Sequence, residues 1–452
     1  MNSTNEQYIR MTTAPIGKLL LSLSIPTIIT MMVTNIYNIV DTAFIGTLGT
    51  SQSGAVGVVF SFMCILQAMA FMCGQGAGSL MSRKLGAKNK KEATMYTSTG
   101  FFLSFFMGLA IAILSFIFMD PLLDILGSTK TIAPYARSYM IYILIAAPFN
   151  TASLTMNNLL RYEGKAKLGT VGLMVGAVLN ISGDAFCIFE LNMGIAGAGL
   201  STAVSQIISF CILLYMFLKG KTETQIRIKE VVLSSFVLKE IIGTGFPSLL
   251  RQGLNSIATM LLNNQAKVYG DAAVSAMSIA TRISFIAVAV ALGIGQGFQP
   301  ISSFNYGAKK YDRVKEAFKK TLISSEVVIT ITLIPIFIYA PTLVRMMRDD
   351  TDVIFIAVRA LRLMCIGLVV TPFTMVVEMG FQSTGAKLYA TMASSLRSGF
   401  ILIPVLLILS KTRGLKGIQE AQPLAFVITA IMCLAFARVF INRLNTKMKL
   451  AG

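Results

Sequence analysis

Residues 19–40 read LLLSLSIPTIITMMVTNIYNIV and carry no charge, and Asp41 follows them directly. At 1.5 Å per residue this helix would be about 33 Å long, enough to cross the roughly 30 Å hydrocarbon core of a bilayer. Similar uncharged runs occupy residues 97–119, 191–218 and 283–308. The segment therefore predicts one span of a helical membrane protein, with an acidic residue near the end of the span.

The composition supports this class. The chain has 452 residues, of which 55% are hydrophobic and 13% are charged, whereas soluble domains average about 25% charged residues. The net charge of +19 is spread over short connectors, so we expect no nucleic-acid partner. All six cysteines lie in apolar segments without metal-type spacing, which argues against a disulfide framework or a zinc site.

Charge-poor runs predict an all-α polytopic membrane protein with twelve transmembrane helices. The predicted spans lie near 17–46, 54–82, 97–119, 132–158, 168–190, 195–218, 239–266, 274–302, 321–344, 354–381, 388–410 and 420–442. With the N-terminus inside, the cytoplasmic segments hold 26 Lys and Arg residues and the outer loops hold 7. Because cytoplasmic loops are enriched in Lys and Arg, both termini are predicted to be cytoplasmic.

The chain repeats itself at a fixed offset. Gly74-Gln75-Gly76 and Gly86-Ala87-Lys88 recur 221 residues later as Gly295-Gln296-Gly297 and Gly307-Ala308-Lys309. An even number of spans in each half predicts two six-helix lobes related by a pseudo-two-fold axis along the membrane normal. The lobes would be residues 1–220 and 238–452, joined by a cytoplasmic linker at 221–237 that lies on the inner membrane surface or is solvated. The cavity between the lobes is the predicted transport site.

Two prolines occupy equivalent positions of the repeat, Pro26 in the first span and Pro247 in the seventh. Each removes a backbone donor and favours a kink, which is either a fixed packing feature or a hinge that bends during transport. The glycines of the second and eighth spans are spaced like small-residue helix contacts, and we expect them to pack rather than to cradle phosphate. These glycines are Gly74, Gly76, Gly78, Gly293, Gly295 and Gly297.

Among the carboxylates inside predicted spans three stand out, namely Asp41, Asp184 and Glu378. Charges at membrane depth are costly, so they mark functional sites by default, although a structural polar cluster is the alternative. Asn180 precedes Asp184 by four residues and shares its helical face; together they could bind a hard cation or a proton. Arg251, Arg282 and Arg397 also lie inside predicted spans and could pair with Glu378 or other acids of the second half. The chain has no histidine, so a proton relay would use carboxylates with tyrosines assisting.

Together these features resemble the multidrug and toxic compound extrusion (MATE) transporters over essentially the whole chain. The resemblance is carried by the two six-span halves, the segment from Pro26 to Asp41, the glycine-rich spans running into Gly-Ala-Lys, Arg161-Tyr-Glu-Gly164 with its counterpart Gln382-Ser-Thr-Gly385, and Gly194-Ile-Ala-Gly197-Ala-Gly199. The acidic pair in the first half is closer to the bacterial DinF-like or MepA-like branch than to the NorM-like branch.

The resemblance implies two sets of site residues. The cation or proton site of the N-terminal lobe would be formed by Asp41, Asn180, Asp184 and Thr202, with Asn157 as an addition and with Na⁺ bound at Asp41, Asn180 and Asp184. By the same resemblance Tyr37 and Asn38 would line the adjoining substrate cavity, and we also expect Glu378, Arg251 and Gln296 in it.

The implied function is export of cationic amphiphilic compounds, driven by inward Na⁺ or H⁺ and using alternating access between the lobes. The protein would be a monomer that spans the bacterial cytoplasmic (inner) membrane many times and needs no cofactor. The 26 methionines suit adaptable binding walls. Two alternatives remain: a flippase for lipid-linked precursors from the same superfamily, which would favour a basic cavity, and a membrane-embedded enzyme, against which the lack of a nucleophile and base in company argues.

Overall fold

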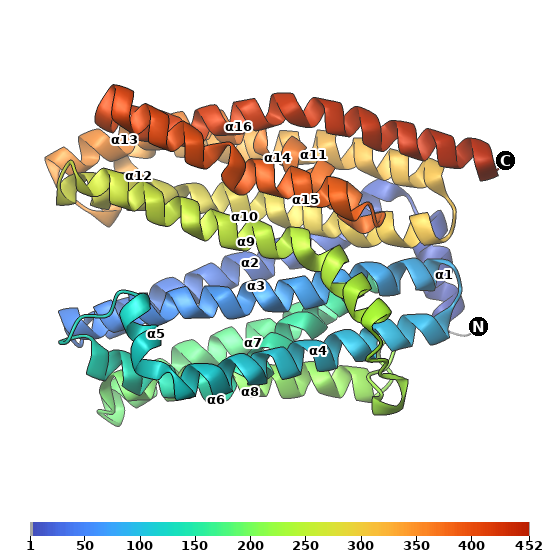
Figure 1. The fold of residues 1–452 in the computed structure, drawn as a ribbon, viewed down its shortest axis with the longest axis horizontal. Helices are drawn as coiled ribbons and strands as arrows, with labels where there is room; N and C mark the ends of the chain where they lie inside the picture. Colours follow the sequence, from blue (N-terminus) through green and yellow to red (C-terminus); the bar gives the residue numbers. More distant parts are fainter. Residues whose placement is uncertain (1–2, 452) are drawn as a thin grey trace. The chain divides into compact units, whose positions relative to one another are not determined.

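The computed structural model describes residues 3–451, and this part of the chain is built from helices and short connections (Figure 1). The helices up to the linker are α1 (Ser3–Thr13), α2 (Ile16–Gly46), α3 (Thr50–Gly86), α4 (Lys90–Ile117), α5 (Met119–Ile125), α6 (Ala133–Tyr162), α7 (Ala166–Ala185), the π-helical turn η1 (Phe186–Glu190) and α8 (Gly194–Leu218). After the 3₁₀ turn η2 (Ile228–Glu230) come α9 (Ser235–Lys267), α10 (Asp271–Gly307), α11 (Tyr311–Ile338), α12 (Ala340–Met347), α13 (Thr351–Leu368), α14 (Thr371–Ser383), α15 (Lys387–Ser395), the π-helical turn η3 (Leu396–Phe400) and α16 (Leu402–Ala451).

The twelve predicted spans are confirmed. Within the described residues nine helices are long and apolar enough to cross a membrane, and α13 with α14, bent by 47° at their break, makes a tenth. The long segment Lys387–Leu450 counts as one of the nine, but it divides at Gly414, whose φ of 61° is not helical. The remaining span is α9, which is 33 residues long and more polar because it carries Lys239, Glu240 and Arg251. Both chain ends lie outside the described residues, so their side of the membrane stays a prediction.

Packing divides the chain into two compact units that do not follow chain order. The first unit holds the described residues up to Tyr8 together with Ile29–Gly245, and the second holds Ile9–Ile28 together with the chain from Phe246 onward. In the first unit α3, α4, α6, α7 and α8 pack side by side, and in the second α10, α11, α13, α14 and α16 do so (Figure 1). The lobe boundaries at 220 and 238 stay a prediction.

The repeated glycines bring helices into close contact, as predicted. A Cβ on Gly76 of α3 would lie 2.1 Å from the Ile241 carbonyl oxygen at the start of α9, within the first unit. In the second unit a Cβ on Gly297 of α10 would lie 2.2 Å from Ser24 Oγ in the first half of α2. The same motif thus performs the same packing in each half of the repeat. Gly74, Gly78, Gly293 and Gly295 also lack room for a Cβ.

Part of the linker is docked on the first unit. The Glu163 carboxylate, at the C-terminal end of α6, accepts backbone N–H bonds from Glu223 at 3.0 Å and Thr224 at 2.9 Å, and the Thr224 hydroxyl also donates to it. Glu223 forms an ion pair with Lys165 at 2.8 Å, and residues 222–224 are buried. This stretch is therefore neither solvated nor lying on the membrane surface. Burial raises the pKa of Glu163 despite these donors.

Candidate functional site

The predicted acidic site forms in the first unit, where α2, α7 and α8 meet. Asp41 on α2 and Asp184 on α7 are 7% and 0% exposed, and their carboxyl groups contact each other as hydrogen-bond partners. Asn180 donates through its side-chain amide to Thr202 Oγ1 at 3.1 Å and to Asp184 Oδ1 at 3.4 Å. The structure therefore brings together four of the five residues predicted for this site.

The cluster has unused acceptors. Oδ1 of Asp41, Oδ2 of Asp184 and Oδ1 of Asn180 are buried without a hydrogen-bond donor. A buried acceptor without a partner costs about 1 to 3 kcal/mol, and two adjacent carboxylates in a low-dielectric site cannot both be ionised cheaply. Oxygens of this kind match the preference of a hard cation, and the carboxyl pair equally matches a shared proton. The described residues contain no group of three His, Cys, Asp or Glu that could hold a metal.

Two tyrosines and a serine complete the cluster. Tyr139 on α6, 1% exposed, is hydrogen-bonded to Thr202 and interacts electrostatically with both carboxylates. Tyr37, one turn before Asp41 on α2, also interacts electrostatically with both carboxylates. Ser201 donates its hydroxyl to the Asn180 carbonyl at 3.0 Å. The sequence indicated tyrosine assistance but did not single out Tyr139, because no acid or other polar pattern on its span points to Asp41 or Asp184.

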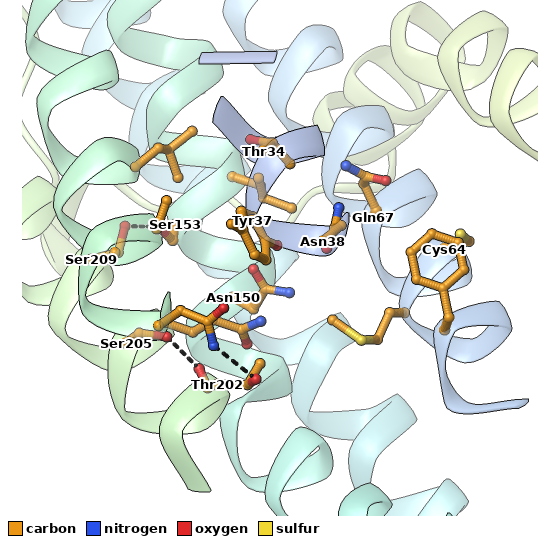
Figure 2. Close-up of a pocket in the computed structure, with 18 residues that line it drawn as sticks. Thr34, Tyr37, Asn38, Cys64, Gln67, Asn150, Ser153, Thr202, Ser205 and Ser209 are labelled. Atoms are coloured by element: carbon orange, nitrogen blue, oxygen red, sulfur yellow. Dashed lines mark hydrogen bonds between the residues drawn. The ribbon is translucent and has the colours of Figure 1, made fainter. Parts of the chain in front are cut away.

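A cavity of about 110 Å³ adjoins the cluster inside the first unit (Figure 2). Its wall includes Tyr37 and Asn38, as predicted, and also Asn180 and Thr202 of the cluster itself. None of the residues that line it carries a charge at neutral pH. The remaining lining residues are Thr34, Phe60, Met63, Cys64, Gln67, Asn150, Ser153, Leu154, Leu173, Gly176, Ala177, Ser205, Gln206 and Ser209. The wall is therefore apolar with amide and hydroxyl groups, and it shares two residues with the acidic site.

The other predicted cavity residues lie in the second unit. Glu378 of α14 is fully buried and accepts from Arg251 at 2.6 Å and from Arg397 at 3.5 Å, so the expected pairing of Arg251 with Glu378 is confirmed. Arg397 lies on the π-helical turn η3. Gln296 is 2% exposed on α10. The structure thus places Glu378 in a buried ion-pair cluster, and the substrate-cavity role of these residues stays a prediction.

Asn157 does not join the acidic site. Its side-chain amide lies beside Gly169, near the start of α7, 2.6 Å from where a Cβ on that glycine would be. Gly169 precedes Asn180 by eleven residues, which is about 16 Å along a helix. Asn157 shares α6 with Tyr139 but lies five turns further along it, so the addition of Asn157 that the resemblance implied does not fit this geometry.

The two predicted hinge prolines lie where the chain passes from one unit to the other. Pro26 is two residues before Ile28, the last residue of its stretch in the second unit, and Pro247 is two residues after Gly245, the last residue of the first unit. Both lie inside continuous helices, α2 and α9. The position of both prolines at the passage between units fits a hinge, and bending of α2 and α9 at these prolines stays a prediction.

Sequence reasoning missed one carboxylate at membrane depth. Glu326 of α11 accepts the backbone N–H of Phe373, in the first turn of α14. A carboxylate there satisfies one of the free N–H groups at a helix N-terminus, next to the break between α13 and α14. A complete list of acids inside the predicted spans would have found it.

Comparison with known proteins gives a consistent result. The MatE family model matches residues 26–186 and 247–408. The multidrug export protein MepA of Staphylococcus aureus (strain MSSA476) is 25% identical over 442 residues, covering 98% of each chain. A crystal structure of MATE in complex with MaL6 superposes with a TM-score of 0.91 at 26% identity, covering 97% of this chain and 99% of that one. A MOP superfamily transporter from Pyrococcus furiosus superposes with a TM-score of 0.91 at 25% identity, covering 97% of this chain and 98% of that one. The binding pocket of that protein is described as having a reverse polarity that suggests a different function.

Proposed function

Because this chain belongs to the MatE family, we propose that it is a multidrug efflux transporter that exchanges cationic amphiphilic compounds for Na⁺ or H⁺. The relatives named above are transporters and not enzymes, which removes the membrane-embedded enzyme from consideration. Bacterial relatives of this chain are multidrug export proteins, and we propose the bacterial cytoplasmic membrane as its location. Both termini inside and a monomeric state are part of the proposal.

One observation carries the coupling mechanism. Asn180 and Thr202 belong both to the acidic cluster and to the wall of the 110 Å³ cavity. A cation or proton that engages Asp41 and Asp184 changes the donors and acceptors that these two side chains offer to the cavity. A substrate in the cavity would in turn alter the affinity of the cluster for the ion, since coupling between two sites is reciprocal.

The size of the cavity implies movement. Drug-sized ligands occupy pockets of roughly 300 to 1,000 Å³, so a cavity of about 110 Å³ must widen before such a substrate enters. The wall that carries Tyr37 and Asn38 is α2, which also carries Pro26 and Asp41. We propose that neutralisation of Asp41 and bending of α2 near Pro26 change the volume of the cavity together.

The test is dye transport by reconstituted protein. A fluorescent cationic dye is loaded into proteoliposomes, and a Na⁺ gradient or a pH gradient is imposed separately. We expect one gradient to drive dye movement and Asp41→Asn or Asp184→Asn to stop it, while Asp120→Asn, an exposed acid paired with Arg137, transports normally. Normal transport by both cluster variants would remove the cluster from the mechanism.

The flippase alternative is less well supported. Its anionic pyrophosphate substrate would need a basic cavity, whereas the cavity of the first unit has no charged lining residue. Arg251 and Arg397 already face Glu378. If neither gradient moves the dye although the protein is intact, lipid-linked anionic substrates become the next to test.

A further inference from the structure

A second cavity, of about 340 Å³, lies in the second unit where α10, α14 and α16 come together near their C-terminal ends. Its polar wall consists of Tyr306, Thr384, Asn442, Arg443, Thr446 and Lys447. None of these residues takes part in the acidic site or in the cavity of the first unit. The cavity therefore has no role in the mechanism described above.

The charge in this cavity is positive. Arg443 and Lys447, one turn apart on α16, are its charged lining residues, and no acid lines it. The guanidinium of Arg443 lies 5.4 Å from the ring centroid of Tyr389, an arrangement that leaves its N–H groups free to donate sideways. On the adjacent α11, Glu316 is paired with Lys320. Two cations with hydroxyl and amide donors beside them form a site for a phosphate group.

The depth of the cavity places it at the headgroup level. The part of α16 after Gly414 runs to Ala451, which is about 55 Å at 1.5 Å per residue. Arg443 lies about 43 Å along the helix from Gly414, beyond a hydrocarbon core of roughly 30 Å. Its side chain can therefore meet lipid phosphates, whereas the preceding turns face acyl chains.

An apolar stripe leads to this cavity from the hydrocarbon region. Val427, Ile431 and Leu434 are 39%, 63% and 54% exposed, and they share one helical face through their spacing of four and three residues. Arg438 and Asn442 continue the same face by further steps of four residues. A lipid whose acyl chains lie against this stripe would have its phosphate at the cavity. A free phosphate ion would have to bind from water, without the apolar contacts that the stripe provides.

We propose that this cavity binds the headgroup of an anionic phospholipid, with Arg443 and Lys447 holding the phosphate. Basic pockets of this kind between transmembrane helices bind anionic headgroups at the cytoplasmic leaflet. The assignment to that leaflet rests on the orientation proposed above, but the binding itself does not depend on transport. Transport assays and lipid-binding assays can therefore fail independently.

The experiment is native mass spectrometry of the purified protein with added phosphatidylglycerol or phosphatidylcholine. The test variant is Arg443→Gln with Lys447→Gln. The matched control is Lys319→Gln with Lys449→Gln, which removes the same charge from exposed positions that do not line the cavity. At about 1 kcal/mol for each basic side chain, we expect the test variant to lose roughly 30-fold in affinity for phosphatidylglycerol and the control to change little.

Gel filtration and thermal unfolding establish that the variants are folded, and Arg443→Lys alone is expected to keep most of the binding. Equal retention of phosphatidylglycerol by test and control variants would overturn the proposal. So would binding of phosphatidylcholine as strong as that of phosphatidylglycerol. Displacement of the lipid by millimolar inorganic phosphate would show a small-anion site and overturn the assignment to lipid.

Discussion

The buried ion-pair cluster around Glu378 in the second unit can test whether burial determines the cost of losing an ion pair. The chain offers a comparison, because a similar cluster around Glu420 is partly exposed to solvent. Glu378 is fully buried between Arg251 at 2.6 Å and Arg397 at 3.5 Å. Glu420 also pairs with two arginines, Arg359 at 3.0 Å and Arg413 at 2.5 Å, but its side chain is 20% exposed and the arginines are 40% and 57% exposed. The two clusters have the same chemistry and differ in their access to solvent.

Glu378→Gln leaves two buried guanidinium groups without a counter-charge, and removal of one partner from a buried pair costs about 3 to 5 kcal/mol. In Glu420→Gln the two arginines, which are already partly exposed, remain in contact with water. Solvent-screened ion pairs contribute no more than roughly 1 kcal/mol to the free energy of unfolding. At about 2 to 4 °C per kcal/mol for a unit of this size, the expected decrease in Tm is roughly 6 to 20 °C for the first variant and below about 4 °C for the second.

A thiol-reactive dye can report this unfolding, because Cys73, Cys365 and Cys433 are buried and become reactive when the helices separate. Tm is measured in one detergent for both variants and for the unchanged protein. Similar Tm values for the two variants would refute the reasoning that burial decides the cost. An unchanged Tm for Glu378→Gln would show that the arginines find solvent or other acceptors.

Two further predictions concern close packing and the linker. Gly76→Ala and Gly297→Ala should each lower Tm, since the added Cβ would lie 2.1 or 2.2 Å from backbone or side-chain atoms. Gly253→Ala is the control, because a Cβ there would have nothing within 4 Å, and it should leave Tm unchanged or raise it. Equal changes in Tm for all three variants would contradict the close packing of Gly76 and Gly297. Glu163→Ala should speed amide exchange at Thr224, at about 0.5 to 1.5 kcal/mol per lost hydrogen bond, whereas Glu163→Gln should keep most of the protection. Burial raises the pKa of Glu163, so the folded protein favours the protonated form of this side chain. Amide exchange at Thr224, corrected for intrinsic rates, should therefore be slowest at low pH and should become faster as the pH rises through that raised pKa. An exchange rate that does not depend on pH would show that Glu163 does not control docking of the linker.

Local pattern predicted most of the helices and the core of the acidic site. Uncharged length determines where a span can lie, so the first span, predicted at 17–46, is observed at Ile16–Gly46. The spacing of Asn180 and Asp184 placed both on one helical face, and the structure confirms their contact. The pairing of Arg251 with Glu378 followed from the cost of leaving either charge alone.

The remaining features depend on contacts between distant residues. Tyr139 belongs to the site because α6 lies beside α8, where Thr202 is, and no periodicity in either helix shows this. Asn157 faces Gly169 and not the acids for the same reason. The docking of the linker depends on Glu163 being aimed at residues 223 and 224, which lie sixty positions later in the chain.

The division of α2 between units constrains how the protein is made. Residues 9–28 belong to the second unit, and Ser24 Oγ contacts the Ile294 carbonyl, 270 positions later. A ribosome adding about 5 to 20 residues per second needs roughly 14 to 54 seconds to synthesise that interval. During this time the first half of α2 is in the bilayer without its packing partner, so its apolar length alone must hold it there. Two separately expressed halves cut at the linker would each lack a helical segment that the other carries.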